Sequence, residues 1–324
     1  MAQHPILTVN NLHIVVSTPH GVTQTVNEVS FEIEAGKVFG LVGESGSGKT
    51  MTCMSLLHLL PEQAKVAEGS VTFRNKDLLT CSEEEVRKIR GSEIAFIMQN
   101  PMTAFNPVRT IGRHFIETLG THLPITKRQA EKIALEHLEK MDLPNPANVL
   151  KQYPFQLSGG MLQRVMIAIT MSLQPSILIA DEPTTALDAT NQLQILRQLD
   201  QIRKEYDTGI LLVSHDLGVI AQLADEVAVM YDGYIVEKAP ASTLFNRPMH
   251  PYTRVLLQAR LGLTSRRRRK GIDRVGVSYP KPLNREDICP FLDRCENADH
   301  ICATKKPEWT EYEQDHLVRC VKLR

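Results

Sequence analysis

The sequence predicts an α/β protein in which helices cover a mostly parallel sheet. Three short apolar segments typical of buried strands, Lys37–Val42, Ser176–Ala180 and Gly209–Val213, are separated by segments of helical periodicity, which is the pattern of a parallel sheet. The first of these strands runs directly into a glycine-rich turn at residues 43–48. Of the 324 residues, 42% are hydrophobic and 23% are charged, which supports a substantial core and excludes a wholly disordered chain.

Charge and hydropathy exclude several classes of protein. The 37 Lys and Arg residues balance the 37 Asp and Glu residues, so bulk charge gives no argument for a nucleic-acid partner. No apolar run approaches the roughly 20 residues that a membrane-spanning helix needs. The opening residues, MAQHPILTVNNL, lack the basic region and apolar stretch of a signal peptide, so we expect a non-secreted protein.

The remaining elements follow in chain order. Ile6–Val16 and Val26–Ile33 alternate apolar and polar residues and are predicted as half-buried strands. Thr50–Leu60 is predicted as a helix that ends at Pro61. Helical sequence is also predicted in four later segments, Ser82–Arg90, Lys127–Met141, Met161–Leu173 and Gln192–Tyr206. Near Asn246 the composition shifts toward Pro, His, Arg and Cys, which predicts a domain at 1–245 and an extension at 246–324.

Residues 43–50, GESGSGKT, fit the phosphate-binding pattern G-x-x-x-x-G-K-[ST] between a predicted strand and a predicted helix. The glycines let the backbone curl so that its N–H groups point at phosphate oxygens, and the helix start adds a positive dipole. Lys49 is expected to reach the β- and γ-phosphates, and the Thr50 hydroxyl to bind Mg²⁺. The loop residues predicted to bind the nucleotide are Ser45, Gly46, Ser47, Gly48, Lys49 and Thr50.

Acidic residues follow the predicted strand at 176–180. Asp181 and Glu182 end this strand, which delivers a carboxylate beside the metal of a phosphate loop. We expect Asp181 to hold Mg²⁺ through its water shell and Glu182 to polarise the attacking water. His215 follows the strand at 209–213, at the strand-end edge where a doubly wound sheet binds its ligand.

Residues 157–164, Leu-Ser-Gly-Gly-Met-Leu-Gln-Arg, resemble the LSGGQ-type signature of ATP-binding cassette (ABC) ATPases. The family's other motifs are present in the family's order: the phosphate loop, a Q-loop glutamine at Gln99, a Walker B end at Asp181 and Glu182, a D-loop at 186–188 and a switch histidine at His215. The resemblance covers roughly residues 6–245. It implies a cassette with a mostly parallel core sheet, an antiparallel β subdomain and a helical subdomain that carries the signature, followed by a small Cys-rich extension.

The resemblance also implies that two cassettes pair around ATP. In this family the signature faces the phosphate loop of a partner, and the residues that would face the partner's nucleotide are Ser158, Gly159, Gly160 and Gln163. The catalytic residues implied are Glu182, His215 and Gln99. Gln99 would sense Mg²⁺ and the attacking water, and His215 would contact the γ-phosphate. Asp188 is the acid of the D-loop, and hydrolysis would open the pair because the γ-phosphate contacts are lost.

The expected adenine site departs from the family pattern. Members often stack adenine on an aromatic residue near the second strand, and His20 occupies that position here. The surrounding residues 17–21, Ser-Thr-Pro-His-Gly, contain no Tyr, Trp or Phe. His20 is therefore either the adenine contact or a solvated turn residue.

Residues 246–257, NRPMHPYTRVLL, look like the segment that follows the cassette in the oligopeptide/dipeptide importer subfamily, which also takes up nickel and metal chelates. Their pattern alone predicts a proline-broken loop and an amphipathic helix. The resemblance implies an ATPase subunit of a peptide importer, peripheral on the cytoplasmic face of the cell membrane. Its partners would be two transmembrane permease subunits, a second ABC ATPase and, indirectly, an extracytoplasmic solute-binding protein. A nickel or metal-chelate importer is the alternative.

Four of the six cysteines lie in the extension, at Cys289, Cys295, Cys302 and Cys320. In a non-secreted chain clustered cysteines favour a metal over disulfides. Four thiolates suit a [4Fe–4S] cluster or Zn²⁺, although the C-x2–4-C pairs usual for zinc are absent here. Some members of the importer subfamily hold an iron–sulfur cluster in such a tail, and unmetallated thiols are the third alternative.

Cys53 and Cys81 are expected to be ordinary apolar or surface residues. The basic run Arg266–Lys270 is expected to be a solvated linker, with lipid headgroup binding as the alternative.

Two other functions are rivals to the importer. A soluble ABC protein of translation or DNA repair generally carries two cassettes or a long coiled coil, and this chain has neither. An iron–sulfur redox sensor using the cassette as a switch is the other rival. Neither explains the segment at 246–257.

Overall fold

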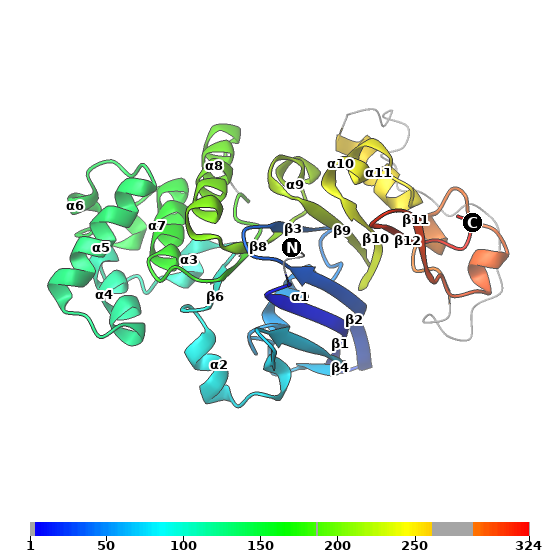
Figure 1. Cartoon of the computed structure of the whole chain (residues 1–324), viewed down its shortest axis with the longest axis horizontal. Coiled ribbons are helices and arrows are strands. Elements are labelled where there is room, and N and C mark those ends of the chain that lie inside the picture. Colours follow the sequence, from blue (N-terminus) through cyan, green and yellow to red (C-terminus); the bar gives the residue numbers. More distant parts are fainter. Residues whose placement is uncertain (1–3, 186, 261–287, 324) are drawn as a thin grey trace. The chain divides into compact units, whose positions relative to one another are not determined.

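The computed structural model describes residues 4–185, 187–260 and 288–323, which form two compact units (Figure 1). Each unit is assembled from segments far apart in the sequence. The first comprises Met1–Leu7, Ile33–Val38 and Phe73–Val213. The second comprises Thr8–Glu32, Phe39–Thr72 and Ser214–Arg324. In the described part of the chain, no helix is both long and apolar enough to cross a membrane.

Three parallel strands form the sheet of the first unit: β6 (Ile94–Ile97), β7 (Ile177–Asp181) and β8 (Gly209–Ser214). The central strand β7 pairs with β6 on one side and with β8 on the other. Every residue of β7 and β8 is buried, as expected for parallel strands covered on both faces. The predicted parallel arrangement is confirmed for β7 and β8, whereas the strand β6 was not predicted.

Helices make up most of the rest of the first unit. They are α2 (Glu83–Ile89), α3 (Pro101–Ala104), α4 (Ile111–His122), α5 (Lys127–Lys140), α6 (Pro146–Val149), α7 (Gly159–Met171) and α8 (Ala189–Tyr206), with the short strand β5 (Lys76–Asp77) before them. Figure 1 shows α4, α5, α6 and α7 gathered together, and α4, α5 and α7 pack on one another. A capping box starts α5, because Thr126 and Gln129 each accept the other's backbone N–H.

The second unit contains two groups of strands. β1 (Leu7–Thr18), β2 (Gly21–Ile33) and β4 (Ala64–Phe73) lie in the order β2-β1-β4. The other strands, in sheet order, are β11 (Trp309–Glu313), β12 (His316–Arg319), β10 (Tyr234–Pro240), β9 (Glu226–Tyr231) and β3 (Val38–Val42). β3 and β9 are parallel, and the other neighbours are antiparallel. The helices of this unit are α1 (Lys49–Ser55), α9 (Leu217–Leu223), α10 (Ala241–Asn246) and α11 (Pro251–Arg260).

The helix predicted over Thr50–Leu60 is wrong in its last turn. α1 ends at Ser55, because the chain turns at His58, whose φ is 53°. The N–H of Leu59 then reaches back to the carbonyl of Met54 at 2.9 Å, a closure typical of helix C-termini with a left-handed residue. Such residues are usually glycine or asparagine, so the histidine gave no signal for this stop.

The C-terminal extension adds a hairpin to the sheet of the second unit, which the sequence did not predict. β12 pairs with β10, and β11 pairs with the other edge of β12. The carboxylate of Glu237, fully buried in β10, accepts hydrogen bonds from the backbone N–H groups of Met249 and His250, and it contacts His316 Nε2 at 2.8 Å. These contacts attach α11 and β12 to the strand that precedes them.

Candidate nucleotide-binding site

The phosphate loop connects β3 to α1, as its sequence pattern requires. Gly46 and Gly48 have φ values of 82° and 105°, in the region that favours glycine. A Cβ atom at Gly43 would lie 2.1 Å from the carbonyl oxygen of Met230, and one at Gly48 would lie 2.7 Å from that of Thr25. The tight curl of this loop therefore depends on glycine at these positions.

Lys49 places a positive charge inside this loop. Its side chain is buried, and Nζ donates to the carbonyl oxygens of Gly43 and Glu44, each at 2.8 Å. Ser45 and Thr50 are exposed on the same loop. A concave loop with a central cation and exposed hydroxyls suits an anion with several oxygens, such as a polyphosphate.

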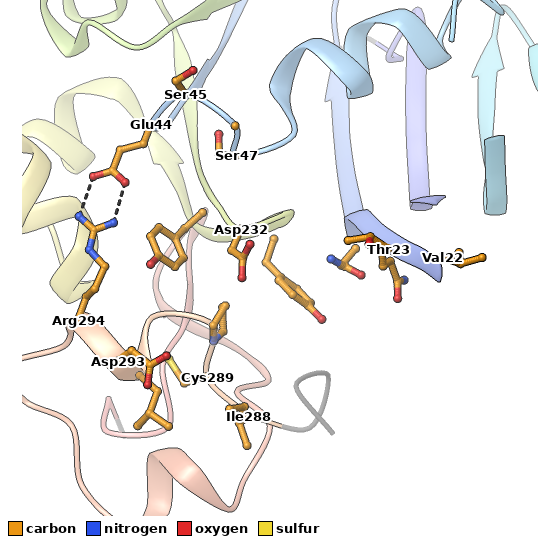
Figure 2. A pocket seen from close by; sticks show the side chains of 17 residues that line it. Val22, Thr23, Glu44, Ser45, Ser47, Asp232, Ile288, Cys289, Asp293 and Arg294 are labelled. Carbon is orange, nitrogen blue, oxygen red and sulfur yellow. Dashed lines mark hydrogen bonds and ion pairs between the residues drawn. The ribbon is translucent and has the colours of Figure 1, made fainter. Parts of the chain in front are cut away.

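The loop lines a pocket of about 610 Å³ in the second unit. Figure 2 shows Glu44, Ser45 and Ser47 on one side and the extension residues Asp293 and Arg294 on another. The strand β2 contributes its beginning to the lining, with Val22 and Thr23. The extension thus shares a pocket with the phosphate loop, which the sequence did not predict.

His20 and His215, also in the second unit, are both exposed. His20 occupies the turn between β1 and β2, where its backbone N–H donates to Thr18 Oγ1 at 3.3 Å. His215 follows β8, and the next residue, Asp216, caps α9 by accepting the N–H of Gly218 at 2.6 Å. Both positions leave the imidazole ring accessible to a ligand.

The predicted acids lie in the first unit at the end of β7. Asp181 is buried, and Glu182 follows it with φ at 50°, a strained value for a residue with a side chain. Its backbone N–H donates to the carbonyl of Val213 at 2.9 Å. Its carboxylate accepts from Thr185 Oγ1 at 2.6 Å and from Gln99 Nε2 at 3.3 Å. The structure thus brings together two predicted catalytic residues, Gln99 and Glu182.

The signature residues lie at the start of α7. Ser158 caps this helix by accepting the N–H of Met161 at 3.3 Å, and Ser158 and Gly159 are exposed. Gly160 packs near Asn191 of α8. Gln163 is only 3% exposed, so its side chain faces the interior of the unit and not the surface that carries Ser158.

The D-loop acid is joined to the signature helix within the same unit. Asp188 caps α8 by accepting the N–H groups of Thr190 and Asn191, both at 3.0 Å, and the hydrogen bonds from Asn191 lower its pKa. The Asn191 side chain also accepts from Arg164 of α7 at 3.1 Å. Position 186, the first of the predicted D-loop, lies outside the described residues.

The four cysteines of the extension line one cavity of about 260 Å³, together with His250 and Phe291 among others. Cys289 and Cys302 are buried, and burial raises the pKa of Cys289 to about 12. None of the four forms a disulfide, and neither does buried Cys53 or half-buried Cys81. Among the described residues, however, no three metal-ligating side chains are grouped so that they could hold an ion. The basic run Arg266–Lys270 lies outside the described residues.

The side chains that hold Glu44 were not predicted from the sequence. Arg294 donates to both of its carboxylate oxygens, at 2.7 and 2.8 Å, and the hydroxyl oxygen of Tyr252 accepts its backbone N–H at 3.0 Å. Tyr252 lies in the segment at 246–257 that had marked the extension. For Arg294 the sequence held no signal, because 250 positions separate it from Glu44.

Comparisons with known proteins cover nearly the whole chain. Residues 26–185 match the family described as ABC transporter, and residues 236–302 match the C-terminal region of oligopeptide/dipeptide transporters. The dipeptide transport ATP-binding protein DppD of Bacillus subtilis is 43% identical over 97% of this chain and 94% of its own. The oligopeptide transport ATP-binding protein AppD of the same organism is 41% identical over 97% of this chain and 96% of its own.

Solved structures share the cassette part of the fold. The dimeric structure of a bacterial ABC transporter cassette matches with a TM-score of 0.66 and 26% sequence identity. The match covers 72% of this chain and 98% of that one.

Proposed function

This chain belongs to the ABC transporter family of ATP-binding subunits, and from that premise we propose that the ATP it hydrolyses energises the import of dipeptides or oligopeptides. The match of residues 236–302 to the C-terminal region of oligopeptide/dipeptide transporters carries this proposal, because a cassette alone is common to the whole family. Relatives named for dipeptide and oligopeptide transport align over almost the full chain.

The division of labour proposed for ATP hydrolysis follows from the side chains present. Lys49, now held by carbonyl oxygens, would turn to the β- and γ-phosphates. The groups proposed to hold Mg²⁺ are the hydroxyl of Thr50 and the amide oxygen of Gln99, with the carboxylate of Asp181 acting through the ion's water shell. Oxygen ligands of this kind are those that the ion prefers. Bound there, the ion would neutralise charge on the phosphate oxygens. Glu182, oriented by Gln99, would polarise the attacking water, and His215 would contact the γ-phosphate.

Pairing with a second cassette is proposed from the exposed start of α7. The hydroxyl of Ser158 and the N–H groups of the first turn are placed to bind a γ-phosphate brought by a partner. The partner is a second ABC ATPase, either a paralogue or a copy of this chain. We further propose that the chain consists of a cassette at 1–245 and an extension at 246–324, and that the cassette contacts two permease subunits. The assembly would act at the cytoplasmic face of the membrane.

The substrate is tested by transport. The chain is purified with its membrane partners, reconstituted in vesicles and supplied with Mg·ATP and its binding protein. Uptake of labelled di- or oligopeptides that stops when ATP is omitted supports the proposal. ATP-driven uptake of Ni²⁺ or a nickel chelate instead replaces the peptide by the metal. Recovery of the chain with ribosomes or DNA-repair proteins, and with no permease, overturns the transport function.

For the extension, we propose that the four-cysteine cavity holds a [4Fe–4S] cluster. The donor set fits in number and kind, since four thiols line one partly buried cavity. Ligation requires the thiols to lose their protons, so it must overcome the raised pKa of Cys289, Cys295 and Cys302. It also requires the side chains to draw closer than they are in the described structure.

Metal analysis distinguishes the three alternatives for this cavity. After anaerobic purification, iron and acid-labile sulfide in a one-to-one ratio support a cluster. Stoichiometric zinc, or neither metal, overturns it in favour of a zinc site or free thiols. Cys302→Ser should abolish binding, and Cys81→Ser is the matched control because Cys81 lies outside the cavity, with its thiol near the carbonyl of Asp77.

A further inference from the structure

Glu44, the second residue of the phosphate loop, is held at three points. Arg294 donates to both carboxylate oxygens, at 2.7 and 2.8 Å, as Figure 2 shows. Tyr252 accepts its backbone N–H at 3.0 Å, and Lys49 donates to its carbonyl oxygen at 2.8 Å. Two of these three contacts come from residues after position 246, so the extension fixes both the side chain and the backbone of a loop residue.

Packing fixes the residues that make these contacts. The guanidinium of Arg294 lies over the rings of Tyr231 and Phe291, 5.5 and 5.7 Å from their centroids. Tyr252 is fully buried and also contacts both rings, with centroid distances of 4.6 Å to Tyr231 and 5.4 Å to Phe291. One aromatic cluster therefore positions both the guanidinium and the tyrosine hydroxyl.

The ion pair between Arg294 and Glu44 is not explained by a contribution to the stability of the fold. The side chains of Arg294 and Glu44 keep 33% and 42% of their surface exposed, and ion pairs at that exposure contribute little to stability. A nucleotide gives a better account. A free carboxylate on the loop would repel a bound triphosphate, and Arg294 both neutralises that charge and holds it by a two-pronged contact.

We propose that Arg294 is a positioning residue for ATP binding: it neutralises the Glu44 carboxylate and holds it in place beside the phosphate loop, so that the extension sets the affinity of the cassette for ATP. This inference rests on the proposed ATPase function. Arg294 itself need not touch the nucleotide, because the effect passes through the charge of the Glu44 carboxylate.

Arg294→Ala is expected to weaken Mg·ATP binding about tenfold, the order expected for one uncompensated like charge beside the phosphates in a partly solvated site. Arg294→Lys keeps the charge without the planar fork, so its affinity for Mg·ATP should lie between those of the parent chain and Arg294→Ala. In the double variant Glu44→Gln/Arg294→Ala the unpaired carboxylate is gone, and affinity should recover most of the loss. In the hydrolysing protein KM for ATP should rise more than kcat falls, since no reacting atom is touched.

Binding of Mg·ATP is measured on the full chain, in complex with its permease subunits, with Glu182→Gln present so that ATP is not consumed. The matched control is Arg247→Ala, which removes an exposed ion pair with Glu313 of β11, 2.5 Å apart. Unfolding midpoints check that each variant is folded. Should Arg294→Ala fail to fold, Arg294→Lys and the double variant are compared instead.

Three results are decisive. Affinity that falls in Arg294→Ala, stays unchanged in Arg247→Ala and recovers in the double variant supports the inference. Unchanged affinity in Arg294→Ala, or a loss that Glu44→Gln does not relieve, overturns it. If the parent chain with Glu182→Gln binds no ATP at all, the proposed ATPase function fails instead, and that outcome is distinct from the other two.

Discussion

Glu182 occupies a strained backbone position between two polar side chains. Its φ of 50° is maintained while Thr185 and Gln99 hold its carboxylate, an arrangement suited to a group that orients water. We predict that Glu182→Gln keeps ATP binding and lowers hydrolysis at least about 100-fold, the usual contribution of a general base. Phosphate release by the assembled transporter measures this. Glu136→Gln on the exposed face of α5 is the control, and hydrolysis that survives in Glu182→Gln would contradict the role.

Buried His250 makes the stability of the extension depend on pH. Burial lowers its pKa to about 3, whereas an unfolded histidine titrates near 6.5. The unfolded chain therefore binds more protons between these values, so stability is present above pH 6.5 and is lost as the pH falls. The loss from this residue is at most about 1.4 kcal/mol per pH unit.

The measurement is the unfolding midpoint between pH 7.5 and 5 for the parent chain and for His250→Asn, which keeps an acceptor for the N–H of Tyr252. The variant should lose less stability over this range than the parent does. Equal slopes in the two proteins would show that folding does not lower the pKa of His250.

At the scale of elements, Ser158 at the start of α7 caps its own helix and is also proposed to bind the nucleotide of a partner. Ser158→Ala removes the cap, so it should lower the stability by about 1 kcal/mol. It should also abolish ATP-dependent pairing. Ser158→Asp restores the cap but places a negative charge where the γ-phosphate is proposed to bind. We therefore predict that Asp rescues the unfolding midpoint and not the pairing, measured by size-exclusion chromatography with Glu182→Gln present. Pairing that recovers with Asp would assign Ser158 a purely structural role.

Local sequence predicts some of these elements and not others. β7 and β8 were predictable because continuous apolar runs ending in acids or polar residues are typical of buried parallel strands. The end of α1 was not, since it depends on a left-handed histidine. β11 and β12 form against β10, and Arg294 meets Glu44 from 250 positions away. Pairings set by tertiary contact leave no periodic signal in the chain, whereas Gln99 and Glu182 were found because each stands in a recognisable motif.

For the whole molecule, ATP is expected to stabilise the folded chain. The residues proposed to bind it include Lys49, in the loop between β3 and α1. A ligand that binds only the folded chain stabilises it by mass action, by about 2.7 kcal/mol at a hundred times its Kd. We predict that Mg·ATP, added to the chain with Glu182→Gln, raises the unfolding midpoint and slows amide hydrogen exchange in β3 and α1, and that Lys49→Ala abolishes both effects. Protection of β3 and α1 that persists in Lys49→Ala would mean that the nucleotide is held without the cation of the phosphate loop, and the role proposed for Lys49 would be wrong.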